Sequence, residues 1–146
     1  MPLKQLLLSI LQETYPGEDD YNAAPTQTLP VIRSRADGRL EYAPMRWWLT
    51  PSWSQGPSTQ YSMFNAKIET AAKSPAFKIP FAKQRCVIPV TGFYEWHRRA
   101  GRKQPFLICD QAQEGLLLAG LWDAWRPRGG AGEAAVRRRL PGGVPV

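Results

Sequence analysis

Histidine and cysteine are scarce in this sequence of 146 residues, which has one histidine, His97, and two cysteines, Cys86 and Cys109. Zinc sites are built from several His, Cys or carboxylate ligands at short spacings, and a Ser-His-Asp triad needs a histidine. Neither cysteine has a second cysteine or a histidine at such a spacing, and each stands in an apolar, strand-like run. The sequence therefore predicts no metal site and no cofactor, and it predicts that both cysteines are buried free thiols.

Long hydrophobic runs are also missing. No apolar stretch approaches the roughly 20 residues that a membrane-spanning helix needs. The first eleven residues lack the small-residue cleavage site of a secretory signal. We therefore expect a soluble cytoplasmic protein with no membrane partner.

Acidic residues are outnumbered: nineteen Lys and Arg against twelve Asp and Glu give a net charge of +7. The excess is concentrated in a cluster of Arg98, Arg99, Arg102 and Lys103 and in the arginine-rich segment 126–139. Positive charge favours a polyanionic partner, because each neutralised phosphate releases condensed counterions. Many basic proteins do not bind DNA, so charge alone indicates a nucleic-acid partner without establishing one.

Local sequence patterns predict two helices. Leucine and isoleucine recur at helical spacing over residues 3–11, and Tyr15-Pro16-Gly17 ends this first helix. Ser74-Pro75 is typical of a helix start and predicts a short helix over 75–83.

The remaining elements are expected to be strands. Residues 29–35 and 39–48 flank Ala36-Asp37-Gly38, a turn sequence that predicts a β-hairpin. Four further runs rich in β-branched and aromatic residues, at 85–90, 93–97, 105–110 and 116–122, predict an antiparallel meander. Short connections favour an α+β fold, with a mixed or antiparallel, curled, barrel-like sheet and a few short helices.

Composition changes after Trp125. The segment 126–146 is rich in Arg, Gly and Pro and has neither strand nor helix periodicity. We expect a single domain over 1–125 followed by a disordered tail. Either a basic arm for nucleic acid or an unstructured terminus is compatible with this composition, and the second reading is the simpler one.

Six short segments follow one another in an order that one protein family shares. They are Tyr-Asn-Ala-Ala-Pro-Thr-Gln at 21–27, Met-Arg-Trp at 45–47, Asn-Ala-Lys-Ile-Glu-Thr at 65–70, Arg-Cys-Val-Ile-Pro at 85–89, Gly-Phe-Tyr-Glu-Trp at 92–96 and Ala-Gly-Leu-Trp at 119–122. Each segment alone is a weak signal, but six in order are hard to obtain by chance. On these residues the chain resembles the SOS-response-associated peptidase (SRAP) family, and it is incomplete at both ends relative to that family.

The resemblance implies abasic-site sensing and processing in single-stranded DNA by covalent DNA–protein crosslinking, with self-peptidase and lyase activity. In the family the mature protein begins with cysteine, which closes a thiazolidine ring on the abasic aldehyde. The family's catalytic Asn and Glu match Asn65 and Glu95, and DNA contacts are expected from Arg46, Trp47 and Lys67. The implied partner is single-stranded DNA with abasic sites, bound by a cytoplasmic, nucleoid-associated monomer.

Glu95 also has an argument from the residues alone. Strand alternation places Phe93, Glu95 and His97 on one face and Tyr94 and Trp96 on the other. Burial beside apolar neighbours would raise the pKa of the carboxyl group and suit a general acid. The competing reading is a strand-edge glutamate paired with a nearby arginine, which contributes little.

The other candidates have plainer alternatives. Asn65 outside its motif would be interpreted as a turn or capping residue. Lys67 stands where the family usually has arginine, so a bidentate phosphate contact would become a point-charge contact. Trp47, Trp48 and Trp53 could stack on unpaired bases or pack in the core. Trp48 stands where the family commonly has glycine, which could obstruct approach of DNA.

Two family features are not found in the sequence. Position 2 is proline rather than cysteine, and no His-x-Arg-Met-Pro motif is present. His97 belongs to a different motif and is not assigned the role of the family histidine. Two further hypotheses therefore stay open: a non-catalytic single-stranded DNA-binding remnant of the same fold, and a structural relic without affinity for DNA.

Overall fold

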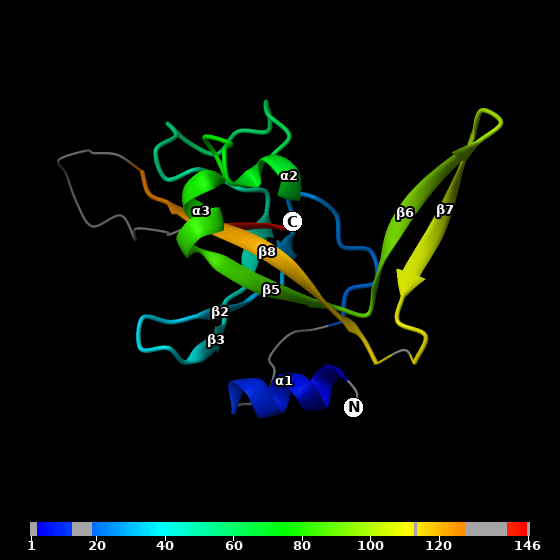
Figure 1. Cartoon of the computed structure of the whole chain (residues 1–146), viewed down its shortest axis with the longest axis horizontal. Helices are drawn as coiled ribbons and strands as arrows, with labels where there is room; N and C mark the ends of the chain where they lie inside the picture. Colours follow the sequence, from blue (N-terminus) through cyan, green and yellow to red (C-terminus); the bar gives the residue numbers. More distant parts are fainter. Residues whose placement is uncertain (1–2, 13–18, 113, 128–139, 146) are drawn as a thin grey trace.

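The computed structural model describes residues 3–12, 19–112, 114–127 and 140–145 (Figure 1). The helices are α1 (Leu3–Leu11), α2 (Ile68–Ala71) and α3 (Lys78–Lys83). The strands are β1 (Thr28–Leu29), β2 (Ile32–Ser34), β3 (Leu40–Tyr42), β4 (Met45–Trp47), β5 (Arg85–Val90), β6 (Gly92–Arg99), β7 (Arg102–Cys109), β8 (Leu116–Trp125) and β9 (Leu140–Pro145).

Seven of the strands form one curled, mixed sheet in the order β1-β4-β9-β8-β5-β2-β3. The pair β4 and β9 is parallel, and the other pairs in this sheet are antiparallel. The curl brings Leu29 and Met45, near one end of the sheet, into one apolar cluster with Cys86 and Ile88 of β5. The predicted α+β class with a curled sheet and short helices is confirmed, although the sheet does not close into a barrel.

The helices cover the two sides of this sheet. Leu7 and Leu11 of α1 pack on Ile32 of β2, which confirms the amphipathic helix expected over residues 3–11. Its expected end at Tyr15-Pro16-Gly17 lies outside the described residues. In Figure 1, α2 and α3 lie across β5 and β8 from α1, and Ala71 packs there against Leu121.

Helix α3 begins at Lys78, three residues later than Ser74-Pro75 predicted. The carbonyl group of Ser74 accepts hydrogen bonds from the backbone N–H groups of Phe77 and Lys78, at 3.1 and 2.8 Å. A separate turn therefore precedes the helix, and Ser74 acts through its backbone rather than as the expected side-chain cap.

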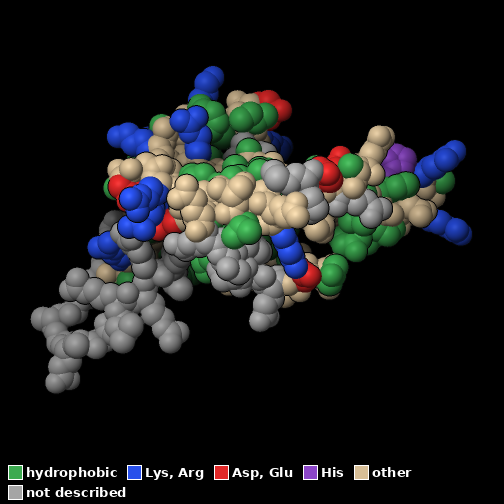
Figure 2. Space-filling view, turned by 90° about the horizontal axis from the view of Figure 1, so that it is seen from below, with side chains coloured by type: hydrophobic (Ala, Val, Ile, Leu, Met, Phe, Trp, Pro, Cys, Tyr) green, Lys and Arg blue, Asp and Glu red, His purple; other side chains and the backbone are tan. Residues whose placement is uncertain are grey.

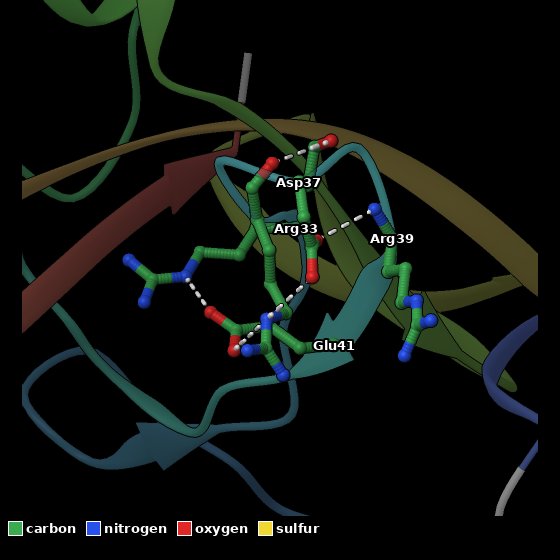
Figure 3. A network of polar contacts seen from close by, with 6 residues as sticks. Arg33, Asp37, Arg39 and Glu41 are labelled. Atoms are coloured by element: carbon green, nitrogen blue, oxygen red, sulfur yellow. Dashed lines mark hydrogen bonds and ion pairs between the residues drawn. The ribbon is translucent and has the colours of Figure 1, made fainter.

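The predicted hairpin at Asp37-Gly38 is confirmed over β2 and β3. Gly38 has a φ of 82°, and the Asp37 carboxylate accepts a hydrogen bond from the Arg39 backbone at 3.0 Å (Figure 3). Across the strands, Arg33 Nε donates to Glu41 Oε1 at 2.7 Å. Strands β2 and β3 are shorter than the two predicted arms. The parts of those arms farther from the turn contribute to a second antiparallel pair, β1 with β4.

The predicted meander of four strands is wrong. Strand β5 pairs with β8 along its whole length, whereas β6 and β7 form a separate two-stranded sheet between them in sequence. This β6–β7 hairpin projects away from the main sheet (Figure 1). Local alternation and turn residues identify strands well, but they do not specify which strand pairs with which.

Residues 140–145 do not fit the prediction of a disordered tail. They form β9, which pairs with β4 and β8 and lies between them. Backbone hydrogen bonding between two strands can hold a segment whose side chains show no periodicity. Residues 128–139 of the same tail lie outside the described part of the chain.

The two cysteines differ in environment. Cys86 is buried in β5, as predicted, but Cys109 is exposed at the end of β7, so the prediction of two buried thiols is wrong for Cys109. The difference follows from the strand pairing, since β7 is outside the main sheet. No helix among the described residues is long and apolar enough to cross a membrane.

The buried carboxylate of Asp123 fixes the segment after β4 to the sheet. It accepts hydrogen bonds from the backbone N–H groups of Ser52 and Ala124 at 2.8 and 2.7 Å, and from Gln84 Nε2 at 3.4 Å. We expect Asp123→Ala to lower the free energy of unfolding by about 2–4 kcal/mol, because three donors in partly buried hydrogen bonds lose their acceptor. Urea denaturation measures this loss. Asp123→Asn keeps one acceptor oxygen and should lose less, and equal losses for the two variants would contradict this account.

Candidate functional site

Three of the predicted site residues are held near one another by a hydrogen bond between β4 and the segment before α2. Trp47 Nε1 donates to the Phe64 carbonyl oxygen at 2.6 Å. Asn65 follows Phe64 directly and is exposed, as is Lys67, while Ala66 between them is buried. Burial of Ala66 thus anchors the segment and leaves Asn65 and Lys67 at the surface beside Trp47.

Arg46 lies next to Trp47 on β4 and is partly buried. Its Nη1 atom is fully buried and has no hydrogen-bond partner among the described residues. A buried donor without an acceptor is costly, more so when it carries charge. Arg46 therefore carries an unpaired, buried donor in this region.

The motif at 21–27 lies against the same strand. Backbone hydrogen bonds join Thr26 N to the Trp47 carbonyl at 2.8 Å and Trp47 N to the Gln27 carbonyl at 2.7 Å. Within the turn, Gln27 Oε1 accepts from Ala24 N at 2.6 Å. Two family motifs that are separated in sequence are therefore adjacent in the fold.

Thr26 adopts a φ of 82°, an uncommon conformation for a β-branched residue. Such backbone strain is often found at functional sites, where the surrounding structure holds it in place. The motif at 21–27 contains Thr26 and Gln27 but predicts no site role for either residue, and threonine normally argues against a left-handed turn. We therefore add this turn, which we call the Thr26 turn, to the candidate site.

The three neighbouring tryptophans have different environments. Trp48 is 9% exposed and its ring lies 5.4 Å from that of Phe64, so it packs inward and does not obstruct the surface. Trp47 is half-buried against the core, and Trp53 is 53% exposed. Core packing thus accounts for Trp48, whereas Trp47 and Trp53 keep surface that a base could contact.

Glu95 is exposed on β6, opposite Phe106 of β7, so the burial expected for it is wrong. No ion pair joins it to Arg98 or Arg99 in the described part of the chain, so the pairing in the strand-edge alternative is not observed, although the exposure of Glu95 agrees with that alternative. Nor does any hydrogen bond between described residues connect Glu95 to Asn65. The two residues stand on different substructures, the β6–β7 hairpin and the segment before α2.

Cys86 is not a candidate nucleophile. Burial raises the pKa of its thiol to about 12, although the nearby Arg33 guanidinium group acts in the opposite direction. Arg33 is itself occupied, because it binds Glu41 and lies over the Trp122 ring at 4.2 Å. The Cys86 thiol is therefore protonated near neutral pH, and only a thiolate is a good nucleophile.

A cavity of about 380 Å³ lies between α1 and the sheet, and residues 85–87 of the motif at 85–89 form part of its lining. Its lining includes Leu7, Ile10, Ile32 and Val87 and contains none of the predicted site residues. The candidate site is thus an exposed surface formed by the Thr26 turn, β4 and the segment before α2.

The fold recurs in solved structures. A protein from Bordetella bronchiseptica matches 97% of this chain with a TM-score of 0.76 at 24% identity, and the match covers 66% of that protein. A second structure, from Bacteroides thetaiotaomicron, matches 82% of this chain with a TM-score of 0.65 at 24% identity and is covered over 49% of its length. At these identities the likeness shows the fold alone.

The structure is an α+β fold with a curled sheet, and this fold carries the six motifs identified in the sequence. The family model for SOS response associated peptidase (SRAP) matches residues 4–137, and the chain belongs to this family. The matched range extends beyond the boundary expected at residue 125.

Two relatives illustrate the extent of the match. Abasic site processing protein YoaM of Bacillus subtilis is 36% identical over 110 residues, which are 74% of this chain and 48% of YoaM. Abasic site processing protein HMCES of Gallus gallus is 32% identical over an alignment of 136 residues, and the match covers 73% of this chain and 40% of HMCES. The chain thus spans about half the length of YoaM and less of HMCES.

Proposed function

We propose that this chain recognises abasic sites in single-stranded DNA through the surface formed by the Thr26 turn, β4 and the segment before α2. The observation that carries the proposal is the hydrogen bond from Trp47 to the Phe64 carbonyl group. It holds the half-buried Trp47 against the segment that carries the exposed Asn65 and Lys67. The family membership and the names of the relatives support it. The net charge of +7 suits a polyanion.

The individual roles follow from side-chain chemistry. The Asn65 amide can hold the deoxyribose or its phosphate, and Lys67 and Arg46 can neutralise phosphates. Trp47 offers an aromatic edge for an unpaired base. The carboxyl group of Glu95 can pass a proton to the sugar ring oxygen as the ring opens to the aldehyde.

Covalent capture in this proposal uses an amino-terminal cysteine, as the family resemblance implies. Its amine condenses with the aldehyde and releases water, and its thiol then adds to the same carbon to close a thiazolidine ring. Removal of the initiator methionine by self-peptidase activity exposes that amine, and lyase activity is the associated strand-cleaving reaction. Position 2 of this sequence is Pro2, so the binding steps and the covalent step are tested separately.

A second candidate function is binding of single-stranded DNA without chemistry. Exposure of Glu95 on the β6–β7 hairpin favours it, because a general acid is normally held against its substrate. The same surface, formed by the Thr26 turn, β4 and the segment before α2, would carry this function. The two candidates differ in covalent adduct formation and not in affinity.

We expect the chain to bind single-stranded DNA in preference to blunt duplex DNA, with a salt-dependent affinity. Contacts with about three phosphates give a log–log salt slope near −2, at about −0.7 per phosphate. Fluorescence anisotropy with labelled strands, measured over a range of salt concentrations, tests this expectation. Lys67→Gln should reduce the slope by about 0.7, whereas the exposed Lys73→Gln is the matched control. A flat salt response, or equal slopes for both variants, would count against this binding surface.

A further inference from the structure

The cavity between α1 and the main sheet has no part in the proposed function. We propose that this cavity, which we call the α1 cavity, binds a medium-chain carboxylate, with the apolar chain under α1 and the carboxylate group at Arg85. Its volume of about 380 Å³ is near the lower end of the range for small-molecule sites, about 300–1,000 Å³. The ligand is therefore small, and its site is separate from the surface proposed for DNA.

Helix α1 forms the roof of the cavity and is attached to the sheet at two points (Figure 1). At its start, the Leu3 backbone N–H donates to the Glu114 carbonyl oxygen at 2.8 Å. Gly115 follows with a φ of 108°, and a Cβ atom at this position would lie 2.8 Å from the Leu3 side chain. One turn further along, Leu7 packs on Ile32 of β2. The position of α1 over the sheet is thus defined by close contacts, and the cavity lies beneath it.

The strand register defines the floor of the cavity. Ile32 is paired with Val87, and Leu117 is paired with Pro89. Directly opposed residues project from the same side of a sheet, as do alternate residues along one strand. The lining residues that share the α1 side of the sheet are therefore Ile32, Ser34, Leu40, Arg85, Val87 and Leu117. This floor is apolar except for one hydroxyl group and one guanidinium group.

Arg85 supplies a positive charge that no carboxylate neutralises. It is exposed, and no ion pair to it is found in the described part of the chain. The other arginine of the lining, Arg33, is paired with Cys86 in the register and belongs to the opposite side of the sheet. There its Nε atom donates to Glu41 at 2.7 Å. Arg85 is thus the available partner for an anionic group at the cavity, and a guanidinium group can bind a carboxylate through two parallel hydrogen bonds.

The apolar lining explains why the anion carries a chain. An apolar cavity holds water poorly, because a water molecule there finds few hydrogen-bond partners. Empty space also deprives the lining atoms of dispersion contacts. Methylene groups that enter the cavity leave water and restore those contacts, so both effects favour binding.

Charge complementarity favours a small anion over a second copy of the chain. The acidic residues of the β2–β3 hairpin, Asp37 and Glu41, are already paired with arginines of the same hairpin. Figure 2 views the molecule from the side on which α1 lies and shows basic side chains gathered at the end where Figure 1 places the β2–β3 turn. A two-fold contact centred on the cavity would bring Arg85 and the exposed Arg39 against their own equivalents.

Chain length provides the first test. Isothermal titration calorimetry with the unmodified chain measures the affinity for octanoate, decanoate, dodecanoate and tetradecanoate below their micelle-forming concentrations. The affinity should rise about 4-fold per methylene group from octanoate to decanoate. It should level off by tetradecanoate, because the cavity is then full. Absence of saturable binding, or a rise that continues through tetradecanoate as in unspecific adsorption, would overturn the proposal.

Charge provides the second test. Arg85→Gln should weaken decanoate binding by about 2- to 5-fold, as expected for an exposed ion pair, and should leave decanol binding unchanged. Lys78→Gln is the matched control, since Lys78 is exposed on α3, across the sheet from α1. Equal decanoate affinities of the parent and Arg85→Gln would overturn the assignment of an anionic ligand.

Filling the cavity provides the third test. Ile10 lines the cavity, and Ile10→Phe should weaken decanoate and decanol alike, by about 15-fold if the phenyl ring displaces two methylene groups. Leu8→Phe is the matched control, since Leu8 is 51% exposed on the same helix. Equal effects of these two substitutions would place the ligand elsewhere and overturn the proposal, and the Arg85→Gln result stands if Ile10→Phe does not fold.

Sedimentation velocity tests the alternative occupant. The parent should be monomeric with and without decanoate. A dimer that decanoate does not dissociate and that Ile10→Phe abolishes would show that a second copy covers the cavity, and the proposal would be overturned. The affinity for abasic single-stranded DNA should be equal with and without saturating decanoate, so failure of this proposal leaves the proposed function standing.

Discussion

Residues 1–146 with Pro2 are expected to form no adduct with abasic single-stranded DNA that survives denaturation. After removal of Met1, the secondary amine of Pro2 can form an iminium with the aldehyde, but it has no thiol to close a stable ring. The same chain opened with Met-Cys-Gly-Arg should give a denaturation-resistant crosslink. One denaturing gel with a labelled abasic strand compares the two proteins, and borohydride should trap at most a trace of the Pro2 adduct.

A Met-Ser-Gly-Arg opening is the matched control, since it supplies the primary amine without the thiol. It should behave like the Pro2 protein in the absence of borohydride. A stable adduct from the Pro2 protein would show that another nucleophile acts, and the exposed Cys109 is then the first candidate. Cys86 is excluded, because burial raises the pKa of its thiol to about 12. Cys109→Ser would identify the source.

In the cysteine-restored protein, Glu95→Gln should slow crosslink formation by about 10²–10⁴-fold while changing DNA affinity little. The reason is that glutamine keeps the size of the side chain and loses the proton that the sugar ring oxygen accepts during ring opening. Single-turnover crosslinking at saturating protein measures the rate, and anisotropy measures the affinity. Because Glu95 is exposed, its replacement should leave the unfolding transition nearly unchanged.

Glu69→Gln is the control for loss of one negative charge, since Glu69 is also exposed and lies on α2 just after Lys67. It should crosslink at the parent rate. If Glu95→Gln reduces rate and affinity in equal proportion, Glu95 is a positioning residue and the general-acid role is wrong. If it has no effect on either, Glu95 has no role in crosslinking or in DNA binding.

Local patterns determined much of this fold from the sequence. The leucine stripe at 3–11 and the β-branched run at 85–90 correspond to elements with the expected bounds, and Asp37-Gly38 forms the expected turn between strands shorter than predicted. Each depends on interactions between residues close in the chain, such as helical spacing or a positive φ at glycine. The six motifs likewise identified the family without the structure.

Pairing and burial were decided by the tertiary structure. Nothing local distinguishes β5 pairing with β6 from β5 pairing with β8, because both partners offer an apolar alternating strand. The actual choice leaves β6 and β7 as a separate hairpin and exposes both Glu95 and Cys109. Alternation predicted correctly which residues share a face of β6, but it carries no information on what covers that face.

The candidate site shows the same division. Sequence motifs named Asn65, Lys67, Arg46 and Trp47, and the hydrogen bond from Trp47 to Phe64 is the contact that joins the two segments. The strained Thr26 turn could not be found from composition, since its φ is imposed by backbone hydrogen bonds to Trp47. Residue chemistry and local propensity are properties of the sequence, whereas long-range hydrogen bonds and burial exist only once distant segments have packed together.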